Sequence, residues 1–337
     1  MTRLEEKDLE LFKTIARMTQ GRLLSELTKI VKNRYKKQQF ITQDYILCEG
    51  DIPIMLVAHL DTVFKEIPKE IYFDQQKQVM WSPTGLGADD RAGVFAILKI
   101  INKGYRPHIC FCTDEEKGGL GASTMVQDIP VAPFDIKYIV ELDRQGSSDC
   151  VFYNCDNEEF ENFVESYGFF SDWGTFSDIS EICPIWKIAG VNLSVGYIDE
   201  HCMVERLHTN YLAATIKRVC KMLDEVDNAP SFEYRESILY RHFGKYWQYM
   251  YPDDGYPIDE WETYNAKILC TKCHTPVPID EAIRVQMKDS LGAARYYCLD
   301  CLTKDNNIEW CAHCGEAFEK AYEEDKYCMS CKKKLMV

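Results

Sequence analysis

The sequence contains no long apolar run and has a deficit of basic residues. No window approaches the roughly eighteen consecutive apolar residues of a membrane-spanning helix. Lys and Arg number 39 against 54 Asp and Glu, which gives a formal net charge of -15. This balance argues against a protein whose main task is to bind nucleic acid or anionic membranes. The amino-terminal residues also lack the apolar core of a secretion signal, so we expect a cytoplasmic protein with no membrane association.

Cysteine, by contrast, is abundant. Half of the 16 cysteines lie in four Cys-x-x-Cys pairs near the carboxyl end of the sequence. In a cytoplasmic chain this spacing indicates metal ligands rather than disulfides, and eight thiolates suffice for two four-cysteine zinc sites. The predicted ligands are Cys270, Cys273, Cys298, Cys301, Cys311, Cys314, Cys328 and Cys331. The remaining eight are interpreted as small core residues: Cys48, Cys110, Cys112, Cys150, Cys155, Cys183, Cys202 and Cys220.

The pairs of this cysteine-rich region could close in sequence, as two zinc ribbons, or interleave, as in cross-brace modules. Only thirteen residues separate Cys314 from Cys328, which favours sequential ribbons. From Lys267 onward the region has eleven basic and eleven acidic residues, so no surface suited to phosphate is evident. We expect docking of a protein partner or presentation of a substrate here rather than nucleic-acid binding. A region this short would depend on metal to fold.

The composition divides the chain into three parts. Residues 1–225 alternate strand-like apolar runs with amphipathic helical stretches, a pattern typical of an α/β fold with a parallel sheet. Residues 226–265 are rich in aromatic residues and are interpreted as a connecting segment that docks on its neighbours. Residues 266–337 form the predicted double zinc-ribbon domain. Helices are expected near residues 9–18, 23–35, 91–104, 122–128 and 209–226.

Potential metal ligands and acids follow each candidate strand of the first part. The run "IMLVAHLD" ends on His59 and Asp61, and "HICFCTDEE" ends on Glu115 and Glu116. Asp143 ends "KYIVELD". The carboxyl ends of parallel strands meet at one edge of a sheet, where ligands bind. The full set expected at this edge also includes Asp89 and Asp90 of a glycine-rich loop, Asp114, Glu141 and His201.

Imidazole and carboxylate together indicate a hydrolytic centre with two divalent ions. Such a centre needs one bridging carboxylate and separate terminal ligands for each ion, and Asp89 in its loop can supply the bridge. Two consecutive glutamates at a strand end point in opposite directions, so Glu116 can bind metal while Glu115 remains free to accept a proton. Asp61 can accept the second N–H of the His59 ring and fix its orientation.

The motifs "AHLDTV", "GLGADDRAG", "TDEEKGGLGA", "ELD" and "NLSVGYIDEHCMVE", in this order, resemble those of the co-catalytic di-zinc exopeptidases. That superfamily includes peptidase T, carboxypeptidase G and the zinc aminopeptidases, and the resemblance spans about residues 50–225. It implies that His59, Asp89 and Asp143 hold one zinc and that Asp89, Glu116 and His201 hold the other. It also implies that Glu115 is the general base, that Asp61 supports His59, and that the Asp89–Asp90 peptide is cis.

The resemblance also implies a three-layer α/β/α zinc-exopeptidase (phosphorylase/hydrolase-like) fold. Many relatives insert a lid or dimerisation domain, but here 29 residues separate His59 from Asp89 and 57 separate Asp143 from His201. Neither gap can hold such a domain, so we expect a compact unit without a lid.

His208 is the alternative to His201 as the last ligand. His201 is favoured because it stands four residues before Glu205, as in the peptidase T type of motif.

Three functions are compatible with these patterns. The first is an exopeptidase, an aminopeptidase or small-peptide hydrolase, with two catalytic zinc ions that Mn²⁺ or Co²⁺ could replace. The second is an amidohydrolase or deacylase that acts on acylated amino acids or conjugates. The third is a zinc-ribbon adaptor protein on a non-catalytic scaffold, although a free base such as Glu115 beside the ligands argues against it. The oligomeric state is left open.

Overall fold

The computed structural model describes residues 3–236, 267–273, 275–278, 283–286, 294–312, 317–322, 325–328 and 331–332, and every structural statement below concerns these residues. The chain divides into two compact units, Met1–Pro252 and Asp253–Val337. No helix of the described residues is both long and apolar enough to cross a membrane.

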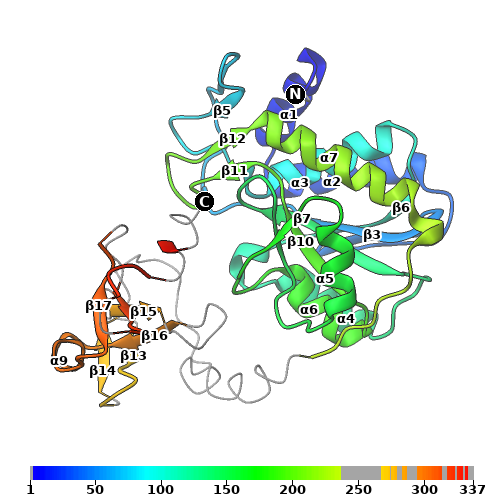
Figure 1. Cartoon of the computed structure of the whole chain (residues 1–337). Helices are drawn as coiled ribbons and strands as arrows, with labels where there is room; N and C mark the ends of the chain where they lie inside the picture. Colours follow the sequence, from blue (N-terminus) through cyan, green and yellow to red (C-terminus); the bar gives the residue numbers. More distant parts are fainter. Residues whose placement is uncertain are drawn as a thin grey trace. The chain divides into compact units, whose positions relative to one another are not determined.

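An eight-stranded sheet runs through the first unit (Figure 1). Its strands, in spatial order, are β1 (Gln39–Ile41), β2 (Tyr45–Cys48), β6 (Pro107–Cys112), β3 (Ile52–His59), β7 (Tyr138–Arg144), β10 (Gly190–Ser194), β8 (Asp149–Val151) and β9 (Phe170–Ser171). The four central strands β6, β3, β7 and β10 are mutually parallel, so their carboxyl ends share one edge. The outer strands β1, β2 and β8 pair antiparallel with their inner neighbours.

Successive side chains of the central strands point to opposite faces of this sheet, and both faces are buried. On β3, Ile54, Leu56 and Ala58 belong to one apolar cluster, whereas Met55 and Val57 belong to a second. The first cluster receives residues of α1 (Glu6–Ala16), α2 (Gln20–Arg34), α3 (Ala88–Asn102), α5 (Glu158–Glu165) and α7 (Thr209–Asp224). The second receives residues of α4 (Leu120–Asp128) and α6 (Asp178–Trp186). The unit is therefore a three-layer α/β/α sandwich, as the sequence predicts.

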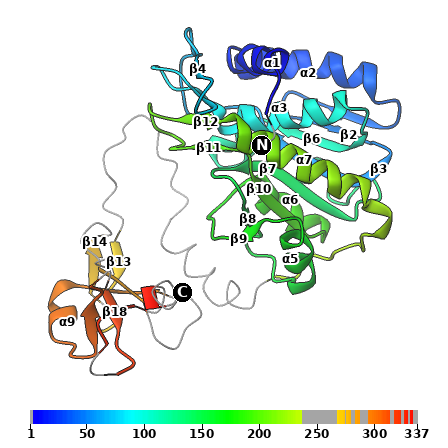
Figure 2. The same cartoon turned by 45° about the horizontal axis from the view of Figure 1, so that its top comes forward.

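A second, smaller sheet stands beside the main one, next to α3 and α7 (Figures 1 and 2). It contains β11 (Tyr197–Ile198), β12 (Arg206–His208), β5 (Val79–Trp81) and β4 (Tyr72–Asp74), in that order. Between His59 and Asp89 in the chain, β4 and β5 form an antiparallel hairpin. No separate domain interrupts residues 3–236, which agrees with the expected absence of a lid.

The start of the aromatic connecting segment packs on the first unit. The short 3₁₀ helix η2 (Val226–Asn228) follows α7. Phe232 is buried against Tyr138, Phe160 and Phe163, and Glu233 forms a β-bridge with Ile188. The rest of the predicted segment, residues 237–265, lies outside the described residues.

The second unit is built from short strands around the cysteines. β13 (Lys267–Leu269) and β14 (Pro276–Pro278) form a hairpin. A four-stranded sheet has the order β16 (Ala294–Tyr297), β15 (Ile283–Gln286), β18 (Ala317–Glu319) and β17 (Ile308–Trp310), and α9 (Leu299–Thr303) follows β16.

Candidate metal centres

His59 and Asp61 lie at the carboxyl end of β3, and Asp143 lies at the same end of the adjacent β7. Asp89 comes from the amino-terminal turn of α3, where the Asp89–Asp90 peptide is cis. His59 Nε2 is 3.0 Å from Asp89 Oδ1 and 3.4 Å from Asp143 Oδ1. These three side chains place donor atoms within 4.8 Å of one another, in an arrangement that could hold one metal ion.

A second group shares Asp89 with the first. His201 Nε2 is 3.2 Å from Asp89 Oδ2 and 3.1 Å from Glu116 Oε2. The two oxygens of Asp89 therefore face different histidines, as a bridging carboxylate requires. The structure thus brings together all five residues that the sequence suggested as ligands of a metal pair.

His201 reaches the site in a different way from the one expected. His201 does not follow a strand of the main sheet, because β10 ends at Ser194. It lies instead in the loop between β11 and β12 of the smaller sheet, which turns it back towards Asp89. His208 is in β12 and stacks on Tyr211 with 4.7 Å between the ring centres. It belongs to neither donor group.

The two glutamates also differ from the expectation of an extended strand end. Asp114 has a positive φ, which ends the extended chain, and the 3₁₀ helix η1 (Glu115–Lys117) follows. Successive side chains of a 3₁₀ helix point about 120° apart. Glu116 therefore reaches His201 while Glu115 Oε2 lies 3.9 Å from His59 Nε2. The two glutamate side chains point in different directions, as predicted. The cause is the 3₁₀ helix, and the expectation of an extended strand end was wrong.

Asp61 contacts His59, as predicted, and it also contacts the turn that carries the two glutamates. Its Oδ1 lies 3.2 Å from His59 Nδ1. The same carboxylate accepts the backbone N–H of Glu115 on Oδ1, at 3.0 Å, and that of Glu116 on Oδ2, at 3.1 Å. One side chain therefore orients the imidazole and also fixes the turn that carries both glutamates.

Glu205 is a site residue whose role the sequence reasoning missed. This buried carboxylate accepts the backbone N–H of Ala88 at 3.0 Å and that of Asp89 at 3.2 Å. Burial raises the pKa of Glu205 to about 7. The loop that supplies His201 thus also holds the backbone of Asp89. In the sequence, Glu205 was used only for its spacing from His201. Its contact with Asp89 spans more than a hundred residues, so no short stretch of the chain could indicate it.

Asp143 is held by three side chains. Ser177 Oγ donates to its Oδ2 at 3.0 Å, and the Tyr197 hydroxyl donates to its Oδ1 at 3.1 Å. The Asn192 amide accepts its backbone N–H and donates to its carbonyl oxygen. These contacts come from the N-cap residue of α6, from β11 and from β10, so the position of Asp143 depends on the packing of all three elements.

Asp90 and Gly93 fix the turn behind Asp89. Asp90 is fully buried and accepts the backbone N–H groups of His59 and Gly93. A side chain at position 93 would collide with the carbonyl oxygen of Leu142, so glycine allows α3 to approach β7. The remaining acids expected at this edge do not join the donor groups. Glu141 is buried on β7, and Asp114 accepts a hydrogen bond from Gln20.

The electrostatics of the site follow from burial and crowding. Burial opposes a charge on His59, but Asp143 and hydrogen bonds to three carboxylates outweigh it and raise the pKa of His59. Hydrogen bonds to Asp89 and Glu116 raise the pKa of His201 to about 11. Burial raises the pKa of Glu115 to about 9 and that of Asp143 to about 6. The cluster therefore holds protons that a cation could displace.

The second unit brings cysteines into two groups. Cys270, Cys273, Cys298 and Cys301 lie within 4.8 Å of one another through their sulfurs, as do Cys311, Cys328 and Cys331. Cys314 lies outside the described residues. The first group combines the first two Cys-x-x-Cys pairs, which is the sequential arrangement. Burial opposes ionisation of Cys270, but backbone N–H groups outweigh it and lower its pKa to about 6.

The interpretation of the eight other cysteines as core residues holds for seven of them. Cys202 is the exception, because it is exposed in the loop that carries His201. Its place in a turn between two short strands leaves no apolar layer to cover it.

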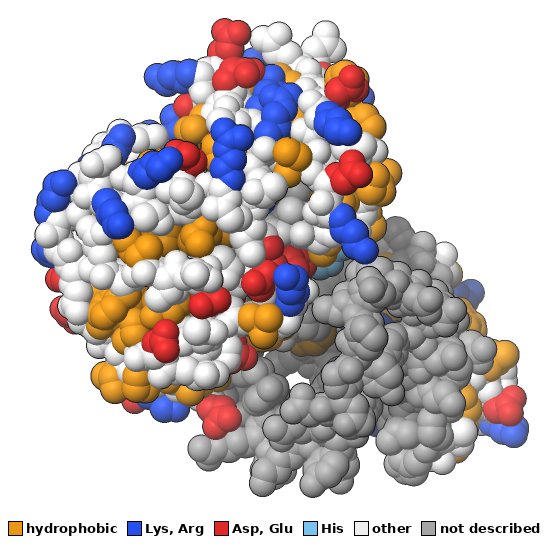
Figure 3. Space-filling view, turned by 180° about the vertical axis from the view of Figure 1, so that it is seen from behind, with side chains coloured by type: hydrophobic (Ala, Val, Ile, Leu, Met, Phe, Trp, Pro, Cys, Tyr) orange, Lys and Arg blue, Asp and Glu red, His pale blue; other side chains and the backbone are white. Residues whose placement is uncertain are grey.

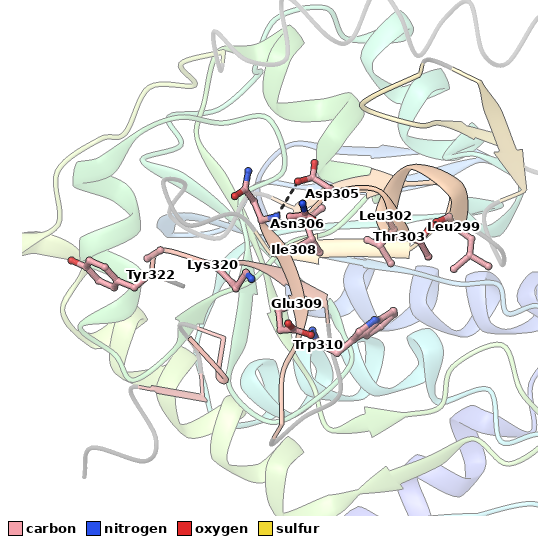
Figure 4. Close-up of a pocket in the computed structure, with 12 residues that line it drawn as sticks. Leu299, Leu302, Thr303, Asp305, Asn306, Ile308, Glu309, Trp310, Lys320 and Tyr322 are labelled. Atoms are coloured by element: carbon pink, nitrogen blue, oxygen red, sulfur yellow. Dashed lines mark hydrogen bonds between the residues drawn. The ribbon is translucent and has the colours of Figure 1, made fainter. Parts of the chain in front are cut away.

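A hollow of about 810 Å³ lies on the second unit (Figure 4). Leu299, Trp310 and Tyr322 line it and are more than half exposed. Asp305, Glu309 and Lys320 line the same hollow, so its rim carries charges of both signs.

Comparison with known proteins finds likeness at the level of structure. No protein-family model and no curated sequence matches the chain. A tripeptidase from Staphylococcus aureus superposes with a TM-score of 0.54 at 15% identity, covering 68% of this chain and 100% of its own. The aminopeptidase PepT from Bacillus cereus gives 0.51 at 15% identity, covering 67% and 99%. The fold is that of these peptidases.

A third solved structure with this peptidase fold is an aminopeptidase from the archaeon Desulfurococcus kamchatkensis. It has a TM-score of 0.50 at 14% identity and covers 66% of this chain and 97% of its own. Identities this low establish a shared architecture and leave the chemistry to the residues of the site.

Proposed function

We propose that the chain is a zinc-dependent exopeptidase, an aminopeptidase or small-peptide hydrolase, in which two metal ions and Glu115 act together. The observation that carries this proposal is the position of Asp89. Its two oxygens join two donor groups, one with His59 and Asp143 and the other with Glu116 and His201. Glu115 lies beside them without belonging to either group.

The donor atoms fit a pair of divalent ions. Imidazole nitrogens and carboxylate oxygens suit zinc, and Mn²⁺ or Co²⁺ could also occupy such a site. The buried Glu116 Oε1 has no hydrogen-bond partner, and a metal ligand would explain this. Ions held there would polarise a scissile carbonyl and make a water acidic enough to attack it near neutral pH.

The protein's own residues would then handle the proton. Glu115 accepts it from the attacking water and returns it to the leaving amine. Burial raises the pKa of Glu115, and positive charge beside it would lower that pKa again towards neutrality, where a carboxylate can both accept and donate. Asp61 would act as a positioning residue, because it fixes both the His59 ring and the backbone of Glu115.

The charges next to the site favour recognition of an amino terminus over a carboxyl terminus. The nearby basic residues are already engaged. Three of them form ion pairs with carboxylates: Arg144 with Asp172, Lys117 with Asp114, and Arg206 with Asp199. A fourth, Arg91, donates hydrogen bonds to the carbonyl oxygens of Leu60 and Met18. Among the described residues beside the ligands, acidic groups therefore outnumber cations that could pair with a substrate carboxylate.

The proposal is tested with a panel of aminoacyl and acylamino substrates, supplied to the zinc-loaded full-length chain. We expect aminoacyl peptides to be hydrolysed, and Glu115→Gln to lower kcat by about 10²- to 10⁴-fold while bound metal is unchanged. Activity on acylamino substrates alone would favour a deacylase. Equal low activity of the wild type and Glu115→Gln would favour the adaptor and contradict the proposal.

Metal analysis provides a second test that does not depend on the substrate. We expect about four zinc equivalents per chain, two in carboxylate–imidazole ligands and two in thiolates. Asp89→Asn should remove the first pair because both groups depend on this residue. Cys110→Ser, which alters a buried cysteine outside the groups, is the matched control and should retain all of them. Retention of every equivalent by Asp89→Asn would contradict the bridging role.

For the second unit we propose two four-cysteine zinc ribbons within a separate domain, residues 266–337, that binds a protein partner. The support is the grouping of the described cysteines and the exposed Leu299, Trp310 and Tyr322 around one hollow (Figure 4). Charges of both signs at that hollow make nucleic acid the weaker alternative. A cytoplasmic location is part of the same proposal.

A further inference from the structure

Both ends of the loop between β9 and α6 are tied to the strand that carries Asp143. Arg144 Nη2 donates to Asp172 Oδ2 at 2.8 Å and to the carbonyl oxygen of Trp173 at 3.2 Å. At the other end, Ser177 Oγ donates to Asp143 Oδ2 at 3.0 Å. The loop, residues 172–176, is therefore fixed beside the candidate metal centre.

Phe176 extends from this loop towards the turn that carries Glu115. Its ring packs on Gly119, where an added Cβ would lie 2.6 Å from Phe176 Cζ. Gly119 in turn donates its backbone N–H to the carbonyl oxygen of Glu115 at 2.9 Å. The Phe176 ring thus connects the Asp143 side of the site with the Glu115 side.

The apolar side chains around this contact are exposed. Phe176 is 38% exposed, Leu120 is 51% exposed and Trp173 is 72% exposed. Leu120 directly follows Gly119 in the chain, and Trp173 precedes Phe176 in the same loop. We call these three residues the aromatic wall. Leaving large apolar side chains in water is unfavourable, and a cluster of them beside a reactive site is typical of a ligand-binding surface.

Exposure alone would not select these residues. The first unit shows several separate apolar patches on the face drawn in Figure 3. Met203 and Val204 are also exposed, but they line a hollow of about 1100 Å³ with Val79 and Trp81. Met80 and Leu207 alternate along their strands with the residues that line this hollow, and both are buried on the opposite face of the smaller sheet. The hollow therefore lies on the outer face of that sheet. The loop of the aromatic wall is linked to both sides of the metal centre: Ser177, next to Phe176, binds Asp143, and the Phe176 ring lies against Gly119 after the Glu115 turn.

We propose that the aromatic wall binds the side chain of the substrate's first residue, and that the preferred substrates are peptides with a large apolar amino-terminal residue. This inference rests on the proposed function. In an aminopeptidase substrate the first residue carries the scissile carbonyl, so its side chain must lie against whatever borders the Glu115 side of the site. That border is apolar here, and an apolar subsite discriminates by about 10- to 200-fold per methylene group.

The test compares leucyl-alanine, phenylalanyl-alanine and alanyl-alanine as substrates of the zinc-loaded full-length chain. We expect kcat/KM for the first two to exceed that for alanyl-alanine by about tenfold or more. Phe176→Ala and Trp173→Ala should each reduce this ratio, whereas Phe176→Leu should retain most of it. Phe170→Ala is the matched control, because Phe170 is an exposed aromatic residue on β9 outside the wall, and its ratio should equal that of the wild type.

The outcomes separate this inference from the function on which it rests. If no peptide of the panel is hydrolysed, the proposed function fails. If all three peptides are hydrolysed with equal kcat/KM, or if Phe176→Ala and Trp173→Ala keep the wild-type ratio, the aromatic wall is not the subsite and only this inference is overturned. A reduction of the ratio by Phe170→Ala equal to that by Phe176→Ala would also overturn it.

Discussion

The two units place their candidate metal ligands in contrasting surroundings. In the first, His59, Asp89 and Asp143 lie at the edge of a sheet that is buried on both faces by apolar clusters. In the second, the buried clusters are small, and one of them consists of Phe318 and the three cysteines Cys311, Cys328 and Cys331. We therefore expect the first unit to position its candidate ligands by its apolar core and the second unit to depend on metal for its folding.

The largest expected effect tests this contrast directly. Treatment of the full-length chain with a chelator should unfold the second unit, because structural zinc contributes about 10–16 kcal/mol to the folding of small zinc domains. The first unit should remain folded. Hydrogen exchange followed by mass spectrometry should show loss of protection in residues 267–332 and retained protection in β3 and β7. Simultaneous loss of protection in both units would show that the contrast is wrong.

A smaller effect is expected from Asp61→Asn. This change weakens the carboxylate that fixes His59 and the backbone of Glu115 and Glu116. Loss of such a supporting contact lowers metal affinity or activity by about 10- to 100-fold. Competition with a chromophoric zinc chelator measures the affinity. Asp51→Asn, an exposed aspartate just before β3, is the control and should bind zinc like the wild type. Equal affinities would mean that the core alone orients the ligands.

The pH dependence of zinc affinity sharpens the comparison further. A protonated imidazole cannot bind zinc, and the neighbouring carboxylates raise the pKa of His201 to about 11. Zinc must therefore displace a proton below that pH, and affinity in the first unit should fall as the pH falls, by about tenfold per pH unit for each proton displaced. In the second unit the pKa of Cys270 is lowered to about 6, so this thiol contributes little pH dependence above neutrality, whereas the contact with Cys298 raises the pKa of Cys301 to about 12 and leaves that thiol a proton for zinc to displace. Titration calorimetry in buffers of different ionisation enthalpy counts the protons released. Zinc binding to the first unit without proton release would contradict the role of His201.

The smallest effect is expected from His208→Gln. His208 stacks on Tyr211 and belongs to neither donor group, so bound zinc should not change. His201→Gln is the paired variant and should lose the zinc that it shares with Glu116. Metal analysis of the two purified proteins decides between them. Loss of zinc in His208→Gln alone would reverse the assignment.

Much of the fold was predictable because its signals are local. The buried run of β3, the glycine-rich turn before α3 and the amphipathic pattern of α7 are all visible in short windows. The outer strands β8 and β9 were not anticipated. They have three and two residues, too few for a periodic pattern, and they form only because β10 offers an edge to pair with.

The candidate site was likewise predictable only in part. The residues themselves could be named from the sequence because histidine and carboxylates rarely follow several buried strands in succession, and parallel strands end at one edge. Their support could not be named. The bonds from Glu205 to Asp89 and from Ser177 to Asp143 join residues 116 and 34 positions apart.

The sequence by itself determined the residue types of the candidate metal centres, their order along the chain and the separation of the carboxylate and imidazole groups from the cysteines. Those properties depend on residue type and on short spacings. Only the tertiary structure decided that the smaller sheet delivers His201, that Asp61 holds both glutamates and that Phe176 lies against Gly119. Each of these contacts arises when separate segments pack around one core, so no single stretch of the chain specifies it.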